Sequence, residues 1–275
     1  MNLDERERDR AILRRYAGDA TYLAGGAAAI LLQLADPRVA SGVARHSGFR
    51  ERPLDRLAST YEYLMALWFG DERDIRHVVR VVDARHARVR GDGAPAYDAR
   101  DPDAQRWVAA TIVHVQTDLE RRMSRESLPP HIADALVRAY APLAGNLQGG
   151  AAGWPATRAE FDAWWADRMD RVAVGPEARA VARDLLGGTG LPPSLRPLMP
   201  PLRLITTALL PEAIRAAYGF RWTPRAERAA GDWISTLAAA RRVVPMAVRT
   251  LPMRVSLQRV QQRSRYAEGD LRGRG

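Results

Sequence analysis

The fold is decided by one stretch of the chain, HSGFRERPLDRLASTYEYLMALWFGDERDIRHVVRVVDARHARVRG (residues 46–91). Its first half predicts a helix that begins at Pro53 and ends at Gly70. Proline suits the first helical turn because the N–H that it lacks would have no partner within the helix there. Its second half predicts a helix from Glu72 to about Arg90. Both repeat apolar residues at the i, i+3, i+4 spacing of one helix face: Leu54, Leu57, Tyr61, Leu64, Met65 and Trp68 in the first, and Ile75, Val78, Val79, Val82 and Val89 in the second.

One polar residue, His86, falls on the apolar stripe of the second helix, between Val82 and Val89. An imidazole that faces a protein core needs partners for its ring nitrogens, since a buried polar group without a partner costs free energy. Two interpretations stay open for His86: a core histidine bonded to a carbonyl, or a ligand of iron. His114, on another predicted helix, is the competing ligand candidate.

Two further pairs of residues are candidates for a site. Arg56 and Thr60 are four positions apart and so share a helix face beside the apolar stripe, where they either line a pocket or form a solvated flank. Gly25 and Gly26 lie in an apolar helical segment, 20–35, which each glycine weakens by ~1 kcal/mol relative to alanine. Close approach to another helix or to a flat cofactor would explain the two glycines, and both explanations stay open.

The rest of the chain repeats the helical pattern, with capping signals such as Asp101 before Pro102 and Thr223 before Pro224. It shows no strand-like alternation longer than a few residues and no internal repeat. The sequence therefore predicts an all-α protein with one multi-helix domain over residues 20–254. We expect an exposed helix within residues 1–19 and a basic tail over 255–275.

Composition excludes several classes of protein. The chain has no cysteine, which excludes disulfides, a thiolate haem ligand and cysteine-bound iron–sulfur clusters. Its net charge is +10, and all 42 basic residues are arginine, but they are scattered over amphipathic helices without a recognition motif, so we expect no nucleic-acid partner. No H-E-x-x-H motif, Ser–His–Asp order or Glu-x-x-His pair can be singled out.

The ends and the apolar runs bear on location. The first ten residues, MNLDERERDR, lack the apolar core of a signal peptide. The longest apolar run, 24–35, is shorter than the ~20 residues of a membrane-spanning helix. We therefore expect a cytoplasmic protein without a transmembrane segment, while peripheral contact with a membrane and the oligomeric state stay open.

Several stretches together resemble a known family. FRERPLDRLASTYEYL (49–64) followed by RVVDARHARVRG (80–91) is similar to the oxygenase family that includes latex-clearing protein, the bacterial rubber oxygenase, and MpaB, a membrane-bound oxygenase of fungal meroterpenoid biosynthesis. Other stretches fit the shorter bacterial members: AGGAAAILLQLADPRVASGVARHSGF (24–49), WVAATIV (107–113), LLPEAIRAAYGFRWTP (209–224) and RTLPMR (249–254).

This resemblance implies an all-helical fold that holds haem b in a pocket between central helices. It implies His86 as the axial iron ligand and Arg56 and Thr60 as polar residues on the distal side, and we place Gly25 and Gly26 against the cofactor. The implied function is a haem-dependent oxygenase, an oxidoreductase that uses dioxygen on an apolar, isoprenoid-like substrate. The alternative is a non-catalytic helical protein that binds a lipid or isoprenoid.

The chain departs from the family pattern at two positions. Asp36 precedes Pro37 where the family often has His-Pro, and Ser59 stands where rubber oxygenases have a lysine before the threonine. The second departure weakens an extension of rubber-type chemistry to this chain.

Overall fold

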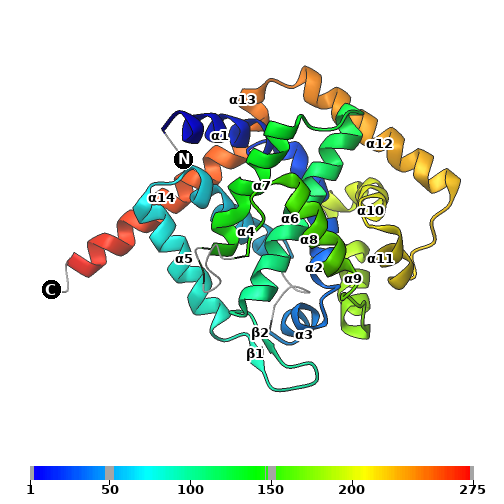
Figure 1. The fold of residues 1–275 in the computed structure, drawn as a ribbon, viewed down its shortest axis with the longest axis horizontal. Helices are drawn as coiled ribbons and strands as arrows, with labels where there is room; N and C mark the ends of the chain where they lie inside the picture. The colour runs from blue at the N-terminus through cyan, green and yellow to red at the C-terminus, as the bar shows by residue number, and fades with distance from the viewer. Residues whose placement is uncertain (1–2, 47–52, 146, 148–152, 273–275) are drawn as a thin grey trace.

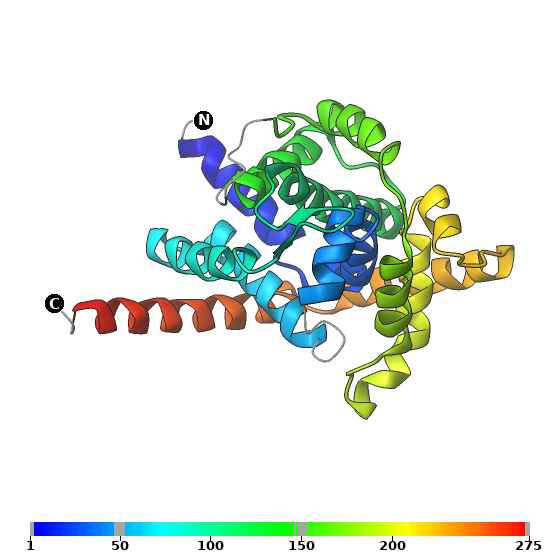
Figure 2. The same cartoon turned by 90° about the horizontal axis from the view of Figure 1, so that it is seen from below.

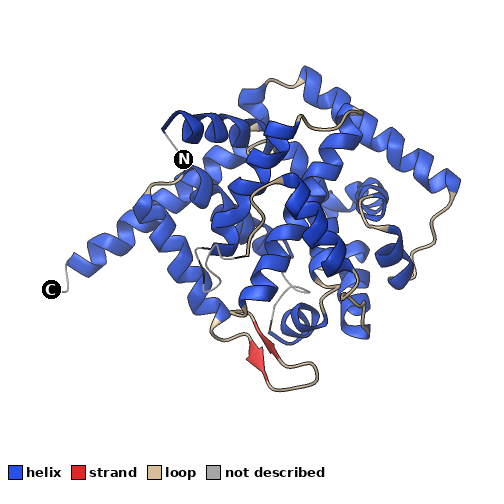
Figure 3. Ribbon diagram, in the orientation of Figure 1, coloured by secondary structure: helices blue, strands red, loops and turns tan. Residues whose placement is uncertain are grey.

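Helices make up almost all of the ordered architecture (Figures 1 and 3). The computed structural model describes residues 3–46, 53–145, 147 and 153–272. In chain order the elements are α1 (Leu3–Tyr16), the 3₁₀ helix η1 (Ala20–Gly25), α2 (Gly26–Gln33), α3 (Pro37–His46), α4 (Pro53–Phe69), α5 (Glu72–His86), β1 (Arg90–Gly91), β2 (Tyr97–Asp98), α6 (Pro102–Ser124), α7 (Pro130–Gly145), α8 (Arg158–Met169), α9 (Pro176–Gly187), the 3₁₀ helix η2 (Pro193–Leu198), α10 (Met199–Ala208), α11 (Glu212–Ala217), α12 (Pro224–Val243), α13 (Met246–Arg249) and α14 (Leu251–Arg272).

The long helix α6 forms the centre of the packing, against α2, α7 and α12 (Figure 1). Asp101 caps its first turn by accepting a hydrogen bond from the Asp103 amide at 2.8 Å, as the Asp-Pro signal predicts. Trp107, Val113 and Leu119 of α6 are almost completely buried. The predicted all-α single domain is confirmed, apart from the two-residue strands β1 and β2, which form a small antiparallel hairpin.

The helices α4 and α5 differ in how well the sequence predicts their ends. α4 begins and ends within one residue of the prediction. α5 begins at Glu72 as expected, with a capping box between Asp71 and Asp74, but it ends at His86 rather than at about Arg90. The helix is shorter than predicted because Arg90 pairs with Asp98 as part of the antiparallel strands of the hairpin. The apolar periodicity of the sequence gives no sign of this strand pairing.

Both ends of the chain pack more closely than expected. The expected exposed N-terminal helix is α1, whose last turn buries Leu13 and Tyr16 where the helix meets α7. The expected basic tail is part of α14, which runs beneath α4 and α5 (Figure 2). Ser256, Val260 and Ser264 are buried along one seam of α14, so the packing continues across both expected boundaries.

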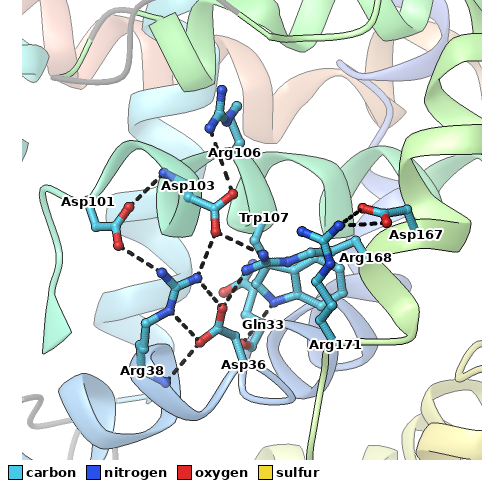
Figure 4. Close-up of polar contacts among 10 residues, drawn as sticks. All are labelled: Gln33, Asp36, Arg38, Asp101, Asp103, Arg106, Trp107, Asp167, Arg168 and Arg171. Atoms are coloured by element: carbon cyan, nitrogen blue, oxygen red, sulfur yellow. Dashed lines mark hydrogen bonds and ion pairs between the residues drawn. The ribbon is translucent and has the colours of Figure 1, made fainter. Parts of the chain in front are cut away.

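A partly buried ionic network joins the start of α3, the start of α6 and α8 (Figure 4). The Asp36 carboxylate accepts hydrogen bonds from the Arg38 guanidinium at 2.8 Å and from Arg168 at 2.6 Å. Arg38 also donates to Asp101 and Asp103, and Arg168 also donates to Asp103. Asp36, at the position where the family often has histidine, therefore links α3 to α8, and the two arginines extend the network to α6.

Candidate functional site

A cavity of about 870 Å³ lies among α2, α3, α4, α5, α6 and α7. Its volume falls in the ~300–1,000 Å³ range of sites for cofactors and small ligands. Aliphatic side chains supply much of its wall, among them Ile30, Leu57, Leu64, Val82, Val108, Ile112 and Val115. An apolar wall of this kind favours an apolar or flat aromatic occupant over a strongly polar one.

All five residues predicted for the site lie on the wall of this cavity: Gly25, Gly26, Arg56, Thr60 and His86. α4 contributes Arg56 and Thr60, and α5 contributes His86 at its last position. Arg56 lies close enough to His86 for its positive charge to lower the pKa of the imidazole. Arg56 and Thr60 are both accessible to solvent, so the cavity is open to water along this part of α4.

His86 has the chemical state that a metal ligand needs. Burial lowers the pKa of His86, and the charge of Arg56 lowers it further, so the ring is neutral at pH 7. Its Nδ1 atom is buried and has no hydrogen-bond partner among the described residues. A neutral imidazole with an unpaired nitrogen on a cavity wall fits the iron of a haem, which needs only one protein ligand on that side.

Arg56 combines access to water with a close protein environment. Burial lowers the pKa of its guanidinium, although part of the side chain remains accessible. This combination is expected of a residue that lines a cavity rather than one that projects from the surface. Even a lowered arginine pKa leaves the side chain charged at neutral pH, so Arg56 can donate hydrogen bonds to an anionic oxygen.

The two glycines differ in what surrounds them. A Cβ atom on Gly25 would lie 2.6 Å from Cγ1 of Val115, so this glycine allows α6 to approach closely. A Cβ atom on Gly26 would lie 3.5 Å from Cδ1 of Leu57, which is ordinary contact. Helix packing therefore explains Gly25, and it does not require a glycine at 26. The predicted helix over 20–35 is divided at this point into η1 and α2.

His114 lies in a different environment from His86. Its ring stacks on Trp165, with centroids 4.0 Å apart and planes 7° from parallel. Burial lowers its pKa to about 4, and the side chain does not line the cavity. Within the described part of the chain there is also no group of three or more His, Asp or Glu side chains that could hold a metal ion. The structure thus separates the two histidines that the sequence left in competition.

A set of polar side chains on the cavity wall does not follow from the helical pattern of the sequence. Tyr61, Tyr63, Gln116 and Tyr140 all line it. The helical stripe places Tyr61 among apolar residues and predicts no role for its hydroxyl. A tyrosine within a core stripe is a usable signal, because its buried hydroxyl needs a hydrogen-bond partner.

Two further residues of the wall, Asp19 and Tyr22, take part in charged contacts that the sequence pattern does not connect. Tyr22 lines the cavity and donates a hydrogen bond to Glu120 at 2.6 Å, and Arg241 pairs with the same carboxylate. Asp19, also on the wall, pairs with Arg249. These contacts tie η1 to helices near the other end of the chain.

The fold and cavity define a class, namely all-α proteins with a large, mostly apolar cavity between helices. The chain belongs to the family described as ER-bound oxygenase mpaB/B'/Rubber oxygenase, catalytic domain, which matches residues 14–254. The resemblance of the short stretches in the sequence is confirmed by this match. None of the described helices is long and apolar enough to cross a membrane.

Relatives of this chain are found in mycobacteria. Uncharacterized protein Mb2261 of Mycobacterium bovis and Uncharacterized protein Rv2237 of Mycobacterium tuberculosis are each 29% identical over 226 residues, which cover 80% of this chain and 88% of the relative. The structure of latex clearing protein in the closed state matches with a TM-score of 0.57 and 18% identity, over 94% of this chain and 74% of that chain. At that identity the likeness shows a shared fold.

Proposed function

We propose that this protein is a haem-b-dependent oxygenase that acts with dioxygen on an apolar, isoprenoid-like substrate. Membership of an oxygenase family supports the reaction class. The observation that carries the haem assignment is the unpaired, buried Nδ1 of neutral His86 on the wall of a cavity of cofactor size.

Each residue of the site has a role in this proposal. His86 would hold the haem iron, and Gly25 and Gly26 would lie against the cofactor. Bound haem would supply the redox-active iron at which dioxygen is activated. Arg56 and Thr60 would donate hydrogen bonds to an oxygen atom of the cofactor or the reactant, and the apolar wall would hold the substrate and exclude water.

A non-catalytic carrier of a lipid or isoprenoid is the alternative. The apolar wall favours it, since binding such a ligand needs no metal. The two functions differ in what they require of His86: a haem protein loses its cofactor when this imidazole is removed, and a carrier keeps its ligand.

The test is the Soret absorbance of the purified protein after haem supplementation, with variants of both histidines. We expect His86→Ala to lose the wild-type Soret band and His114→Ala to keep it, because His114 is stacked on Trp165 away from the cavity. Added imidazole should restore haem binding to His86→Ala, which separates loss of the ligand from loss of the fold. Arg56→Ala should reduce turnover more than haem content.

Two results would contradict the proposal. One is a colourless wild-type protein after haem supplementation, which favours the carrier. The other is a wild-type Soret spectrum in His86→Ala, which removes His86 as the ligand.

A further inference from the structure

Two tyrosines of the cavity wall come from different helices and lie near each other. Tyr61 comes from α4 and Tyr140 from α7, and both line the cavity. The two hydroxyl groups are near enough to interact electrostatically. Even so, the Tyr61 hydroxyl is buried and has no hydrogen-bond partner among the described residues.

The surroundings fix the state of both hydroxyl groups. Burial raises the pKa of Tyr61 to about 12 and also raises the pKa of Tyr140, so both keep their protons at pH 7. Tyr140 donates its proton to Oε1 of Gln116, and Nε2 of Gln116 donates to the carbonyl of Tyr16 at 2.7 Å. Gln116 therefore orients Tyr140, whose oxygen can still accept a bond, while Tyr61 can both donate and accept.

The position of this pair differs from that of the predicted distal residues. Tyr61 is five residues beyond Arg56 on α4, which is ~7.5 Å along the helix axis. Arg56 and Thr60 are accessible to water, whereas Tyr140 and Gln116 are buried. Tyr61 directly follows Thr60 on α4, but its hydroxyl is buried, and apolar residues such as Leu64 and Trp68 line the same cavity.

We propose that Tyr61 and Tyr140, with Gln116 behind them, form a subsite for one uncharged oxygen function of an otherwise apolar ligand, an alcohol or a carbonyl. Such an oxygen would accept a hydrogen bond from Tyr61, and an alcohol would also donate to Tyr140. A plain hydrocarbon would leave the Tyr61 hydroxyl unpaired and cut off from water, and is disfavoured for that reason. If the protein is the oxygenase proposed above, this subsite makes an oxygen-bearing apolar compound its substrate. The catalytic part of the inference rests on that proposal, but ligand binding can be measured without turnover.

The experiment compares farnesol with farnesene, an alcohol and a hydrocarbon of similar isoprenoid skeleton, by isothermal titration calorimetry of the full chain. We expect the wild-type protein to bind farnesol about tenfold more tightly, the effect of one additional buried hydrogen bond. Tyr61→Phe should abolish this preference by weakening farnesol and leaving farnesene unchanged, since the ring that packs in the cavity is retained.

Two phenylalanine variants serve as matched controls. Tyr63 also lines the cavity, and its hydroxyl has no partner among the described residues, but it is two residues from Tyr61, ~200° around α4, so it meets a different part of the wall. Tyr218 lies outside the cavity wall and donates to the Leu31 carbonyl at 2.7 Å. Neither Tyr63→Phe nor Tyr218→Phe should change the ratio of the two affinities.

Equal affinities of the wild-type protein for the two ligands would overturn the subsite, because they would mean that only water bonds to the two phenols. Loss of the preference in Tyr63→Phe but not in Tyr61→Phe would also overturn it. So would the absence of binding of either ligand. The titrations are made with the haem-supplemented protein and with the unsupplemented protein. A protein that takes up no haem refutes the proposed oxygenase, and its farnesol preference still decides the subsite.

Discussion

Replacement of Asp36 by asparagine tests whether the ionic network of Figure 4 holds the cavity helices together. The side chain of Asp36 is only 5% exposed, and Arg168, one of its two arginine partners, is only 9% exposed. Asparagine has the same shape, but it removes the negative charge and turns one acceptor oxygen into a donor that faces a guanidinium. The variant therefore isolates the electrostatic contribution of the network.

The magnitude follows from what each arginine retains. Removing one partner of a buried ion pair costs ~3–5 kcal/mol. Arg38 keeps Asp101 and Asp103, and Arg168 keeps Asp103, so we expect the lower end, ~3 kcal/mol of unfolding free energy. For a chain of this size such a loss lowers the melting temperature by ~6–12 °C.

The assay is urea unfolding followed by circular dichroism, with Asp167→Asn as the control. Asp167 pairs with Arg171 on the surface, where both side chains are about 60% exposed, so its replacement should cost less than ~1 kcal/mol. Equal effects of the two replacements would refute the reasoning. So would an unchanged cost of Asp36→Asn when Arg168 is replaced by methionine, because the two side chains would then be uncoupled.

The same network sets a pH dependence. Burial acts to raise the pKa of Asp36, but hydrogen bonds and charge from Arg38, with the charge of Arg168, outweigh it and hold the pKa below its usual value. A lowered folded-state pKa contributes stability above the unfolded-state pKa of ~3.9, and that stability is lost as the pH falls through the folded-state value. The difference between wild type and Asp36→Asn should therefore be full at pH 7 and shrink below about pH 4.

Two further predictions concern the glycines and His114. Gly25→Ala should lower the free energy of unfolding by ~1–3 kcal/mol, because its Cβ would collide with Val115. Gly26→Ala, at helical φ and ψ, should leave it unchanged or raise it by up to ~1 kcal/mol. Thermal unfolding of the two variants checks this, and equal effects would contradict it. Burial lowers the pKa of His114 to about 4, so as the pH falls the unfolded chain binds a proton at this histidine first, near ~6.5, and the free energy of unfolding should decrease between there and pH 4. His114→Phe should flatten this part of the curve of stability against pH. An unchanged curve would show that His114 does not cause the decrease.

The parts of the fold that the sequence predicted are those with local signals. Pro53 and Gly70 mark the limits of α4, and Asp101 marks the start of α6, because caps and breakers act within one turn of the helix. The sequence does not predict the seam of α14, because two of the three residues buried in the described part of this helix, Ser256 and Ser264, are polar. Ser264 is buried because its hydroxyl donates to Asp74, 190 positions away, at 2.6 Å.

The candidate site follows the same division. His86, Arg56 and Thr60 were found from spacing and family resemblance, and all three line the cavity. The role of Asp36 could not be found in this way, because its partner Arg168 is 132 positions away. The tyrosine pair was missed for a related reason: the pairing of Tyr61 with a residue of α7 appears only once the helices are packed.

The position of His86 depends on more than its own helix. α5 ends at this residue, so the helical periodicity that predicts an inward-facing histidine does not extend beyond it. The chain that follows forms the hairpin β1–β2. Tyr97 of the hairpin packs closely against Gly42 of α3, and its hydroxyl lies 2.7 Å from Nε2 of His46. Contacts to α3 thus hold the chain directly after His86. The backbone at His86 is thus held by three separate elements, α5, the hairpin and α3, which a helical stripe alone does not supply. Such support would help to orient the ring if His86 is the haem ligand proposed above.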